Sequence, residues 1–239
     1  MGETTLDSIC SLNIRQPSHG YRFSMETVLL SSFVSLKAPK KIADFGAGSG
    51  VIGLLLASRF RKARVTLVEM QAALFDLCLV NIAENGLSGR VDALNLDIRK
   101  MRSDLSGFDV VVSNPPFRRP GTGRVSTGQR ASARHEGDLP LSDLCASAAR
   151  ALRGRGRLYL VHLPERLLEI MDSLRAARLE PKRLRFVHGR LGLEARMMLV
   201  EAVREGRPGL KVEPPLYIYK DGSDDYTQEV SEMYRALAG

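Results

Sequence analysis

The sequence predicts an α/β fold with a doubly wound, mostly parallel sheet and an antiparallel last strand. Short apolar segments rich in Val, Ile and Leu alternate with longer segments of helical character, and a glycine-rich turn follows the first of them. The last two apolar segments, Arg183–Val187 and Met197–Val203, are joined too briefly for a helical crossover, so we expect them to pair antiparallel. With 239 residues, 44% of them hydrophobic, we expect one domain over 1–239.

The first 40 residues are expected to form an N-terminal loop and a helical cap. Residues 1–23 are polar and mixed and predict an ordered loop. A helix is expected from Ser24 to Lys37, because Ser24 is a suitable N-cap and Glu26 is favourable in the first turn. The core over 41–205 then begins with alternating elements, which are strand Lys41–Phe45, helix Val51–Phe60, strand Val65–Glu69, helix Gln71–Glu84 and strand Val91–Asp97.

A run of valines within Phe108–Ser113 predicts a fourth strand that is buried on both faces. The remaining expected elements are loop 118–137, helix Leu141–Leu152, strand Arg157–Leu163, helix Glu165–Ala177 and the antiparallel pair. The C-terminal arm and helix, 206–239, contain an edge strand at Leu216–Tyr219 and a helix at Tyr226–Leu237. A cluster of basic residues is interpreted as the carboxyl end of helix Leu141–Leu152, where the helix dipole favours cations: Arg150, Arg153, Arg155 and Arg157.

The composition points to a basic protein of the cytoplasm. Lys and Arg number 35 against 27 Asp and Glu, so the net charge is +8, which favours an acidic partner such as nucleic acid. Cys10, Cys78 and Cys145 are isolated, which predicts reduced thiols and neither disulfides nor a zinc site. His162 and His188 lie in or at the end of strands and are expected to be structural. We find no signal-peptide pattern, no apolar run long enough to cross a membrane and no metal-ligand spacing.

A glycine-rich turn, Gly46-Ala47-Gly48-Ser49-Gly50, separates the first strand from the helix behind it. Glycines here allow a tight turn and let the backbone approach a ligand where a Cβ would intrude. The spacing differs from the G-x-G-x-x-G of dinucleotide enzymes, and no Lys-Ser or Lys-Thr pair follows to hold phosphate. At the next two strand ends, Glu69 can accept hydrogen bonds from both hydroxyls of a ribose and Asp97 from an adenine amino group. The pattern predicts a nucleoside-binding site.

The fourth strand runs into Asn114-Pro115-Pro116-Phe117. Proline cannot donate to a ladder and disfavours helical geometry in the residue before it, so Asn114 is expected to be extended at the carboxyl end of the strand. Open α/β sheets bind their ligands at that edge. An amide oxygen, a nearby carbonyl and a flat ring together suit a planar group that carries an NH₂.

These motifs together resemble the class I S-adenosylmethionine-dependent methyltransferases that modify planar amino groups through an (Asn/Asp)-Pro-Pro-(Phe/Tyr/Trp) motif. The resemblance covers about residues 15–205 and implies a Rossmann-like fold, S-adenosylmethionine as the cofactor and catalytic roles for Asn114, Pro115, Pro116 and Phe117. The amide of Asn114 and the carbonyl of Pro115 would each accept one N–H of the amine, while Phe117 stacks on the base. Cofactor contacts are implied for Arg22, Asp44, Gly46, Ala47, Gly48, Gly50, Glu69, Met70, Asp97, Ile98 and Asn114.

Two further stretches narrow the substrate. Gln16–Leu30 resembles the N-terminal signature of the bacterial tRNA(Val) adenine methyltransferase family, and Ala133–Glu136 is similar to a second stretch of that family. This family methylates the exocyclic amine of the adenosine just 3′ of the anticodon, which implies tRNA as the partner. Glu26 replaces the usual aspartate, and Phe117 stands where tyrosine is frequent and is also typical of guanine-modifying relatives, so both bases stay open.

The loop after the Pro-Pro motif is rich in arginine and contains no acid before Glu136. Such side chains can hold RNA phosphates without reading sequence, although a solvated loop is the alternative. The candidate RNA-binding residues are Arg118, Arg119, Arg124, Arg130 and Arg134. Two rival functions stay open, a protein-glutamine methyltransferase and a non-catalytic RNA-binding protein with the same fold. The first class usually carries a helical substrate domain before the glycine turn, and only 40 residues precede Lys41 here.

Overall fold

Strands and helices alternate along the residues that the computed structural model describes, which are 3–19, 22–102, 105–117 and 139–238. Their order along the chain is β1 (Thr4–Ile9), β2 (Leu12–Pro17), α1 (Met25–Phe33), β3 (Lys41–Phe45), α2 (Val51–Arg59), β4 (Arg64–Glu69), α3 (Ala72–Glu84), β5 (Val91–Asn95), the 3₁₀ helix η1 (Ile98–Lys100), β6 (Phe108–Ser113), α4 (Leu141–Ala151), β7 (Leu152–His162), the 3₁₀ helix η3 (Pro164–Arg166), α5 (Leu167–Ala176), β8 (Leu179–His188), β9 (Ala195–Arg204), β10 (Lys211–Val212), β11 (Leu216–Tyr217) and α6 (Gln228–Ala238).

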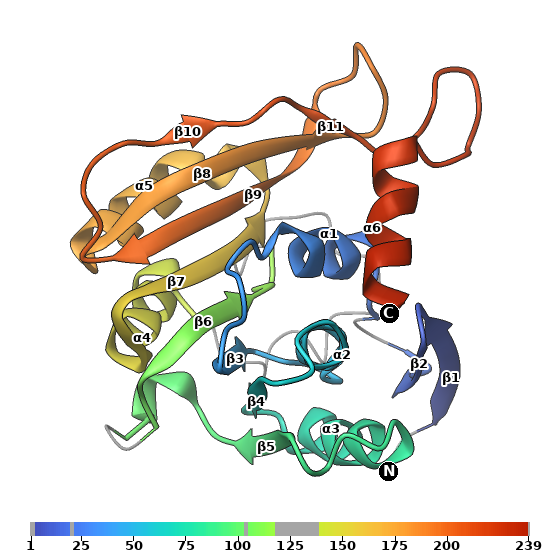
Figure 1. Ribbon diagram of the computed structural model, residues 1–239, viewed down its shortest axis with the longest axis vertical. Coiled ribbons are helices and arrows are strands. Elements are labelled where there is room, and N and C mark those ends of the chain that lie inside the picture. The colour runs from blue at the N-terminus through green and yellow to red at the C-terminus, as the bar shows by residue number, and fades with distance from the viewer. Residues whose placement is uncertain (1–2, 20–21, 103–104, 118–138, 239) are drawn as a thin grey trace, which may run out of the picture.

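The central feature is a nine-stranded sheet in the order β10-β8-β9-β7-β6-β3-β4-β5, with β11 also paired to β8. Strands β3 to β7 pair in parallel, while β9 lies antiparallel between β7 and β8. In Figure 1 the sheet twists from β10 to β5, with α4 and α5 on one side and α1, α2 and α6 on the other. Buried apolar side chains form one core cluster on each side. The predicted doubly wound, mostly parallel fold with an antiparallel last strand is confirmed.

Two arginines from elsewhere in the chain stop helix α1 earlier than the sequence predicts. The helix was expected to reach Lys37 but ends at Phe33. Arg59 donates from Nη1 to the carbonyl of Ser31 at 2.7 Å, and Arg183 donates from Nη1 to the carbonyl of Phe33 at 3.3 Å. The last carbonyls of a helix lack partners within it, and here side chains supply them. These contacts are long-range, so the local pattern does not reveal them.

The expected N-terminal loop is instead a β-hairpin, β1 paired with β2, for most of residues 1–23. Along β2 the side chains alternate, so that Leu12 and Ile14 are buried in the core while Asn13 is exposed. Cys10 occupies the left-handed region at the turn, with φ of 53°. A period of two over only six residues is a weak signal in a polar stretch, and the prediction of a loop was wrong here.

Two asparagines of helix α3 hold the free edge of β2. The Asn81 side chain accepts from the backbone N–H of Arg15 at 2.7 Å and donates to its carbonyl at 2.9 Å. One helical turn later, Asn85 forms the same pair of bonds with Asn13, at 3.0 and 2.7 Å. Asn81 also donates to the carbonyl of Ser49, at 2.8 Å, in the glycine-rich turn. The hairpin and that turn are therefore fixed to the same helix.

Strand β7 begins at Leu152, five residues before the predicted Arg157, and this changes the place of the arginine cluster. Only Arg150 lies in the last turn of α4, which ends at Ala151. Arg153, Arg155 and Arg157 lie on the strand, so their interpretation as a helix terminus was wrong. Leu152 pairs with Phe108 across an irregularity in the ladder, and this pairing extends the strand backwards.

The other predicted elements are present with boundaries that shift by a few residues. Strand β5 ends at Asn95, before the predicted Asp97, because Asp97 is the N-cap of η1. The short strand β10 was not predicted, and α6 begins at Gln228 instead of Tyr226. In the part of the chain that the structure describes, no helix is both long and apolar enough to cross a membrane.

Candidate active site

The predicted site residues lie along the carboxyl edge of four neighbouring parallel strands, β6, β3, β4 and β5. Parallel strands end at the same edge, so their following residues are brought together. Asn114 follows β6, the glycine-rich turn follows β3, and Glu69 ends β4. Asp97 comes two residues after β5. The structure therefore gathers the turn, both acids and the Asn-Pro-Pro-Phe motif in one row.

The glycine-rich turn adopts a backbone that other residues rarely adopt. Gly46, Gly48 and Gly50 have φ of 70°, 59° and 88°. A Cβ on Gly50 would lie 2.8 Å from Cδ1 of Leu67, so this position has no room for a side chain. At Gly46 and Gly48 a Cβ would meet nothing within 4 Å, which leaves open space against the backbone. The turn thus offers a bare backbone surface on which a ligand can lie.

Asp44 lies beneath this turn and is buried. Its Oδ2 accepts the backbone N–H of Gly53, in the first turn of α2, at 2.9 Å. Its Oδ1 is buried without a hydrogen-bond partner among the described residues. Burial raises the pKa of the Asp44 carboxyl to about 7; the Gly53 hydrogen bond opposes this rise and the charge of Glu69 adds to it. Asp44 therefore fixes the start of α2, and its predicted cofactor contact stays a prediction.

Glu69 joins the two loops that flank the edge of β4. Its Oε2 accepts the N–H of Gly48 at 2.8 Å, and its Oε1 accepts the N–H of Gln71 at 2.9 Å. Only 5% of Glu69 is exposed, whereas the neighbouring Met70 is 44% exposed. Each carboxylate oxygen can accept more than one hydrogen bond. The arrangement combines a fixed acceptor with an apolar side chain at the surface.

Asp97 caps the 3₁₀ helix η1. Its Oδ1 accepts the N–H of Arg99 at 2.9 Å, and the Arg99 guanidinium donates to both carboxylate oxygens at 2.7 to 3.0 Å. The side-chain hydrogen bond from Arg99 lowers the pKa of the Asp97 carboxyl. Ile98, another predicted contact, has its side chain buried in the core. Asn95 donates to the carbonyls of Glu69 and Met70, at 2.9 and 3.0 Å, and so joins this corner to β4.

A serine that the sequence analysis did not single out fixes the Asn-Pro-Pro-Phe motif. Ser113, the last residue of β6, donates from Oγ to the carbonyl of Phe45 at 2.7 Å and is buried. Phe45 immediately precedes the glycine-rich turn, so this bond holds Asn114 next to that turn. Asn114 and Phe117 are half-buried, and Pro115 is buried. A buried strand-end serine is a weak signal by itself, and its partner is distant in sequence.

His162 lies at the carboxyl end of β7, and its ring contacts the ring of Phe117 with centroids 5.3 Å apart. It is buried, and its Nδ1 accepts the N–H of Leu163 at 2.8 Å. Burial lowers the pKa of His162 to about 4, and the positive charge of Arg166 acts in the same direction. The ring is therefore neutral near pH 7. As expected it has a structural contact, but that contact is to a predicted catalytic residue.

The predicted contacts from the N-terminal segment have partners of their own. Arg22 forms an ion pair with Asp7, with Nη2 2.9 Å from Oδ2, and Gln16 donates to the same oxygen at 2.8 Å. The hydrogen bond from Gln16 is the largest cause that lowers the pKa of Asp7. Glu26 has a buried Oε2 without a hydrogen-bond partner in the described part of the chain. A cofactor contact of Arg22 stays a prediction.

The predicted arginines of the loop after the motif lie outside the described residues. In the described ranges no group of three or more His, Cys, Asp and Glu could hold a metal ion. Cys10, Cys78 and Cys145 are free thiols.

Comparison with known proteins identifies the family. Residues 22–177 match the methyltransferase small domain. The chain belongs to the methyltransferase small domain family. This methyltransferase is 32% identical to the tRNA1(Val) (adenine(37)-N6)-methyltransferase of Porphyromonas gingivalis, over 76% of this chain and 74% of that protein. It is 30% identical to the protein of the same name from Shewanella sp. strain W3-18-1, over 67% of this chain and 68% of that one.

Solved structures agree with the fold of this methyltransferase. A predicted O-methyltransferase from Agrobacterium tumefaciens superposes with a TM-score of 0.73 and 26% identity, covering 89% of this chain and 97% of that one. A geranyl diphosphate methyltransferase in complex with S-adenosylmethionine gives a TM-score of 0.55 at 15% identity, covering 75% and 85%. The expected Rossmann-like methyltransferase fold is confirmed.

Proposed function

We propose that this methyltransferase transfers a methyl group from S-adenosylmethionine to the exocyclic amine of an adenosine in the anticodon loop of a tRNA. The observation that carries the proposal is the Ser113–Phe45 hydrogen bond, which holds Asn114 beside the glycine-rich turn. The relatives from Porphyromonas and Shewanella, named for adenine and tRNA, support adenosine over guanosine and over protein glutamine.

The residues along the sheet edge fit the cofactor. Open space above Gly46 and Gly48 can take an extended ligand, and the Glu69 carboxylate next to it can accept ribose hydroxyls. Met70 offers exposed apolar surface for a planar ring, and Asp97 has acceptor capacity beyond its bonds to Arg99. When bound, the cofactor supplies an electrophilic methyl group on a sulfonium.

Asn114 and Pro115 are proposed to hold the amine that accepts the methyl group. The nitrogen lone pair of an adenine amine is delocalised into the ring, so the amine is a poor nucleophile. Two N–H donations, to Oδ1 of Asn114 and to the Pro115 carbonyl, draw the nitrogen toward a pyramidal shape and make its lone pair available. Placement within about 3–3.5 Å of the methyl carbon then supplies much of the acceleration, and a fixed polar site adds to it.

Phe117 is proposed to stack on the adenine, and His162 supports its ring from the side. A neutral imidazole against Phe117 limits the positions of that ring without adding a charge to the site. A base must leave its neighbours to reach this edge, and anticodon-loop bases are already partly unstacked. The methylated amine can lose its proton to water, so no strong base is required.

The test is transfer of labelled methyl from S-adenosylmethionine to unmodified bulk tRNA, followed by mass spectrometry of the nucleosides. We expect label on the adenosine amine, and we expect Asn114→Ala to lower the rate by about 100-fold or more, as does loss of a positioned hydrogen-bonding group elsewhere. Cofactor affinity of the variant, measured by calorimetry, should be retained. Label on guanosine would overturn the choice of base. An Asn114→Ala enzyme with full activity would remove Asn114 from the mechanism.

A further inference from the structure

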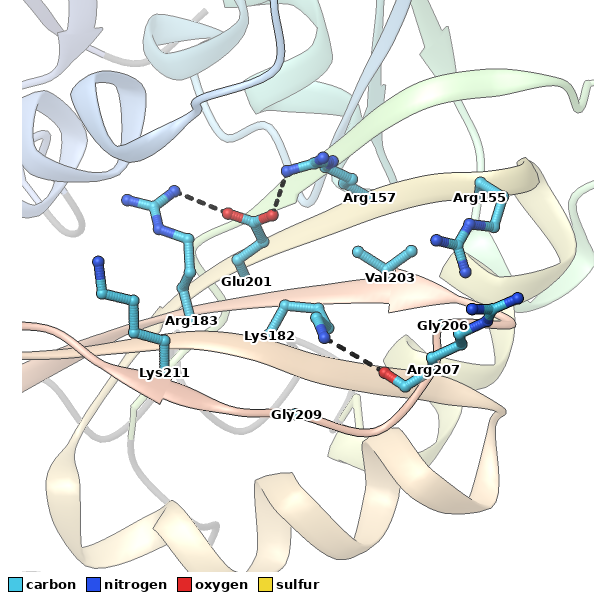
Figure 2. Close-up of a pocket in the computed structure, with 10 residues that line it drawn as sticks. All are labelled: Arg155, Arg157, Lys182, Arg183, Glu201, Val203, Gly206, Arg207, Gly209 and Lys211. Atoms are coloured by element: carbon cyan, nitrogen blue, oxygen red, sulfur yellow. Dashed lines mark hydrogen bonds and ion pairs between the residues drawn. The ribbon is translucent and has the colours of Figure 1, made fainter.

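A basic cavity lies away from the proposed active site, on the antiparallel part of the sheet (Figure 2). Its volume is about 440 Å³, and strands β7, β8, β9 and β10 and the β9–β10 connection contribute its lining. Six of the ten lining residues carry a positive charge and one carries a negative charge. The six are Arg155, Arg157, Lys182, Arg183, Arg207 and Lys211.

Two of these arginines are used to neutralise the buried acid of the cavity. Glu201 is 1% exposed and lies between Arg157, which contacts its Oε1, and Arg183, whose Nη1 is 2.7 Å from its Oε2. Arg183 also pairs with Glu213, Nε to Oε1, at 2.8 Å. The floor of the cavity is therefore an ordered ion-pair network. It orients the surrounding strands and leaves no carboxylate in the floor for a further cation.

The other four basic residues keep their charge without a carboxylate partner in the described part of the chain. Arg155 donates to the carbonyl of Glu205 at 3.1 Å, and Lys182 donates to the carbonyl of Arg207 at 3.2 Å. Arg155, Arg207 and Lys211 are exposed, and Lys182 is half-buried. Figure 2 shows their side chains around the same opening. Charges gathered in this way attract an anion.

The geometry of β7 sets the distance from this cavity to the active site. Arg157 precedes His162 by five residues and Arg155 by seven. At about 3.3 Å per residue, the cavity begins roughly 17 to 23 Å from the edge at which Phe117 lies. A base held at Asn114 cannot reach the cavity, whereas its own strand can, several nucleotides along the chain.

We propose that this cavity binds the phosphate backbone of the tRNA, several nucleotides away from the methylated base. Four uncompensated cations that face an open cavity suit consecutive phosphates of a polyanion, and the net charge of +8 agrees with such a partner. The proposal rests on tRNA as the substrate. The cavity adds affinity and orientation, and the chemistry stays at the sheet edge.

The experiment compares the wild-type enzyme with the double variant Arg207→Glu/Lys211→Glu. Fluorescence anisotropy of labelled tRNA, measured at several salt concentrations, reports binding independently of methylation. We expect the Kd of the variant to rise about tenfold or more at 0.15 M salt, and the slope of log K against log salt to become shallower by about two. Affinity for S-adenosylmethionine, unchanged by calorimetry, shows that the variant is folded.

Lys62→Glu/Arg64→Glu is the matched control, since both residues are exposed and lie four strands or more away in the sheet. This control should bind tRNA within about twofold of the wild type. If the cavity variant binds tRNA as the control does, with the same salt slope, the proposal is overturned. If the wild type binds tRNA but does not methylate it, only the proposed function fails. A wild type without tRNA affinity overturns both.

Discussion

The two halves of the sheet use charge in opposite ways. At the edge of β3, β4 and β5, buried or partly buried carboxylates accept hydrogen bonds from backbone amides, as Asp44 does from Gly53 and Glu69 from Gly48. In the cavity over β7 to β10, charge is carried by long side chains that surround a single buried Glu201. The first half is shaped by the backbone and the second by side chains. Backbone shape suits one small cofactor, and long basic side chains suit a polymer of repeated phosphates.

The largest expected effect concerns the acid at the centre of the second half. Glu201→Gln keeps the shape but leaves Arg157 and Arg183 without their shared countercharge. Loss of one partner of a buried ion pair costs about 3–5 kcal/mol, so we expect the free energy of unfolding in urea to fall by about 3 kcal/mol. Glu213→Gln, which affects only the more exposed pair with Arg183, is the control and should cost about 1 kcal/mol or less. Equal losses for both variants would contradict the central role of Glu201.

The next effect tests the first half. Glu69→Ala removes the acceptor of the Gly48 amide and the proposed acceptor of the ribose. Hydrogen bonds to a charged group contribute about 1.5–3 kcal/mol each, so affinity for S-adenosylmethionine should fall by a factor of about 10 to 150. Titration calorimetry measures it, with the exposed Asp172→Ala on α5 as the control. Unchanged affinity of the Glu69 variant would show that this edge does not hold the cofactor.

The smallest effect concerns His162, on the strand that joins the two halves. Its pKa of about 4 in the folded protein lies below the ordinary value of 6.5, so the unfolded chain binds more protons between these values. Stability that is present above pH 6.5 is then lost as the pH falls toward 4. At pH 5.5 the loss should be about 1 kcal/mol relative to pH 8. His162→Gln, compared by urea unfolding at both pH values, should lack this part of the pH dependence; an identical dependence would refute the assignment.

The sequence predicted the cofactor half better than the basic half, for a physical reason. A tight turn that needs left-handed backbone at Gly50, and a strand stopped by Pro115, are conditions that neighbouring residues impose. The arginines of β7 were misplaced because their strand is defined by pairing with Phe108, more than 40 residues earlier. His162 and Ser113 acquire their roles from equally distant partners. Local motifs cannot report such contacts.

The ends of the chain illustrate the same limit. The hairpin was missed because its stability comes from α3 and the core, whereas the antiparallel pair β8–β9 was predicted from the length of its connection. That all 239 residues form one domain stays a prediction. It is supported by β10 and β11, which pair with β8, and by α6, which contributes Val230 and Leu237 to the same core as α1 and α2.

The two asparagines of α3 have a further consequence for the solubility of the chain. A strand at the border of a small sheet exposes unpaired N–H and C=O groups, which can recruit a strand from another molecule. In β2 these groups are occupied at Asn13 and Arg15 by side-chain amides one helical turn apart. The helix thus closes the border of the hairpin without adding a strand, and removes at those positions a template for self-association.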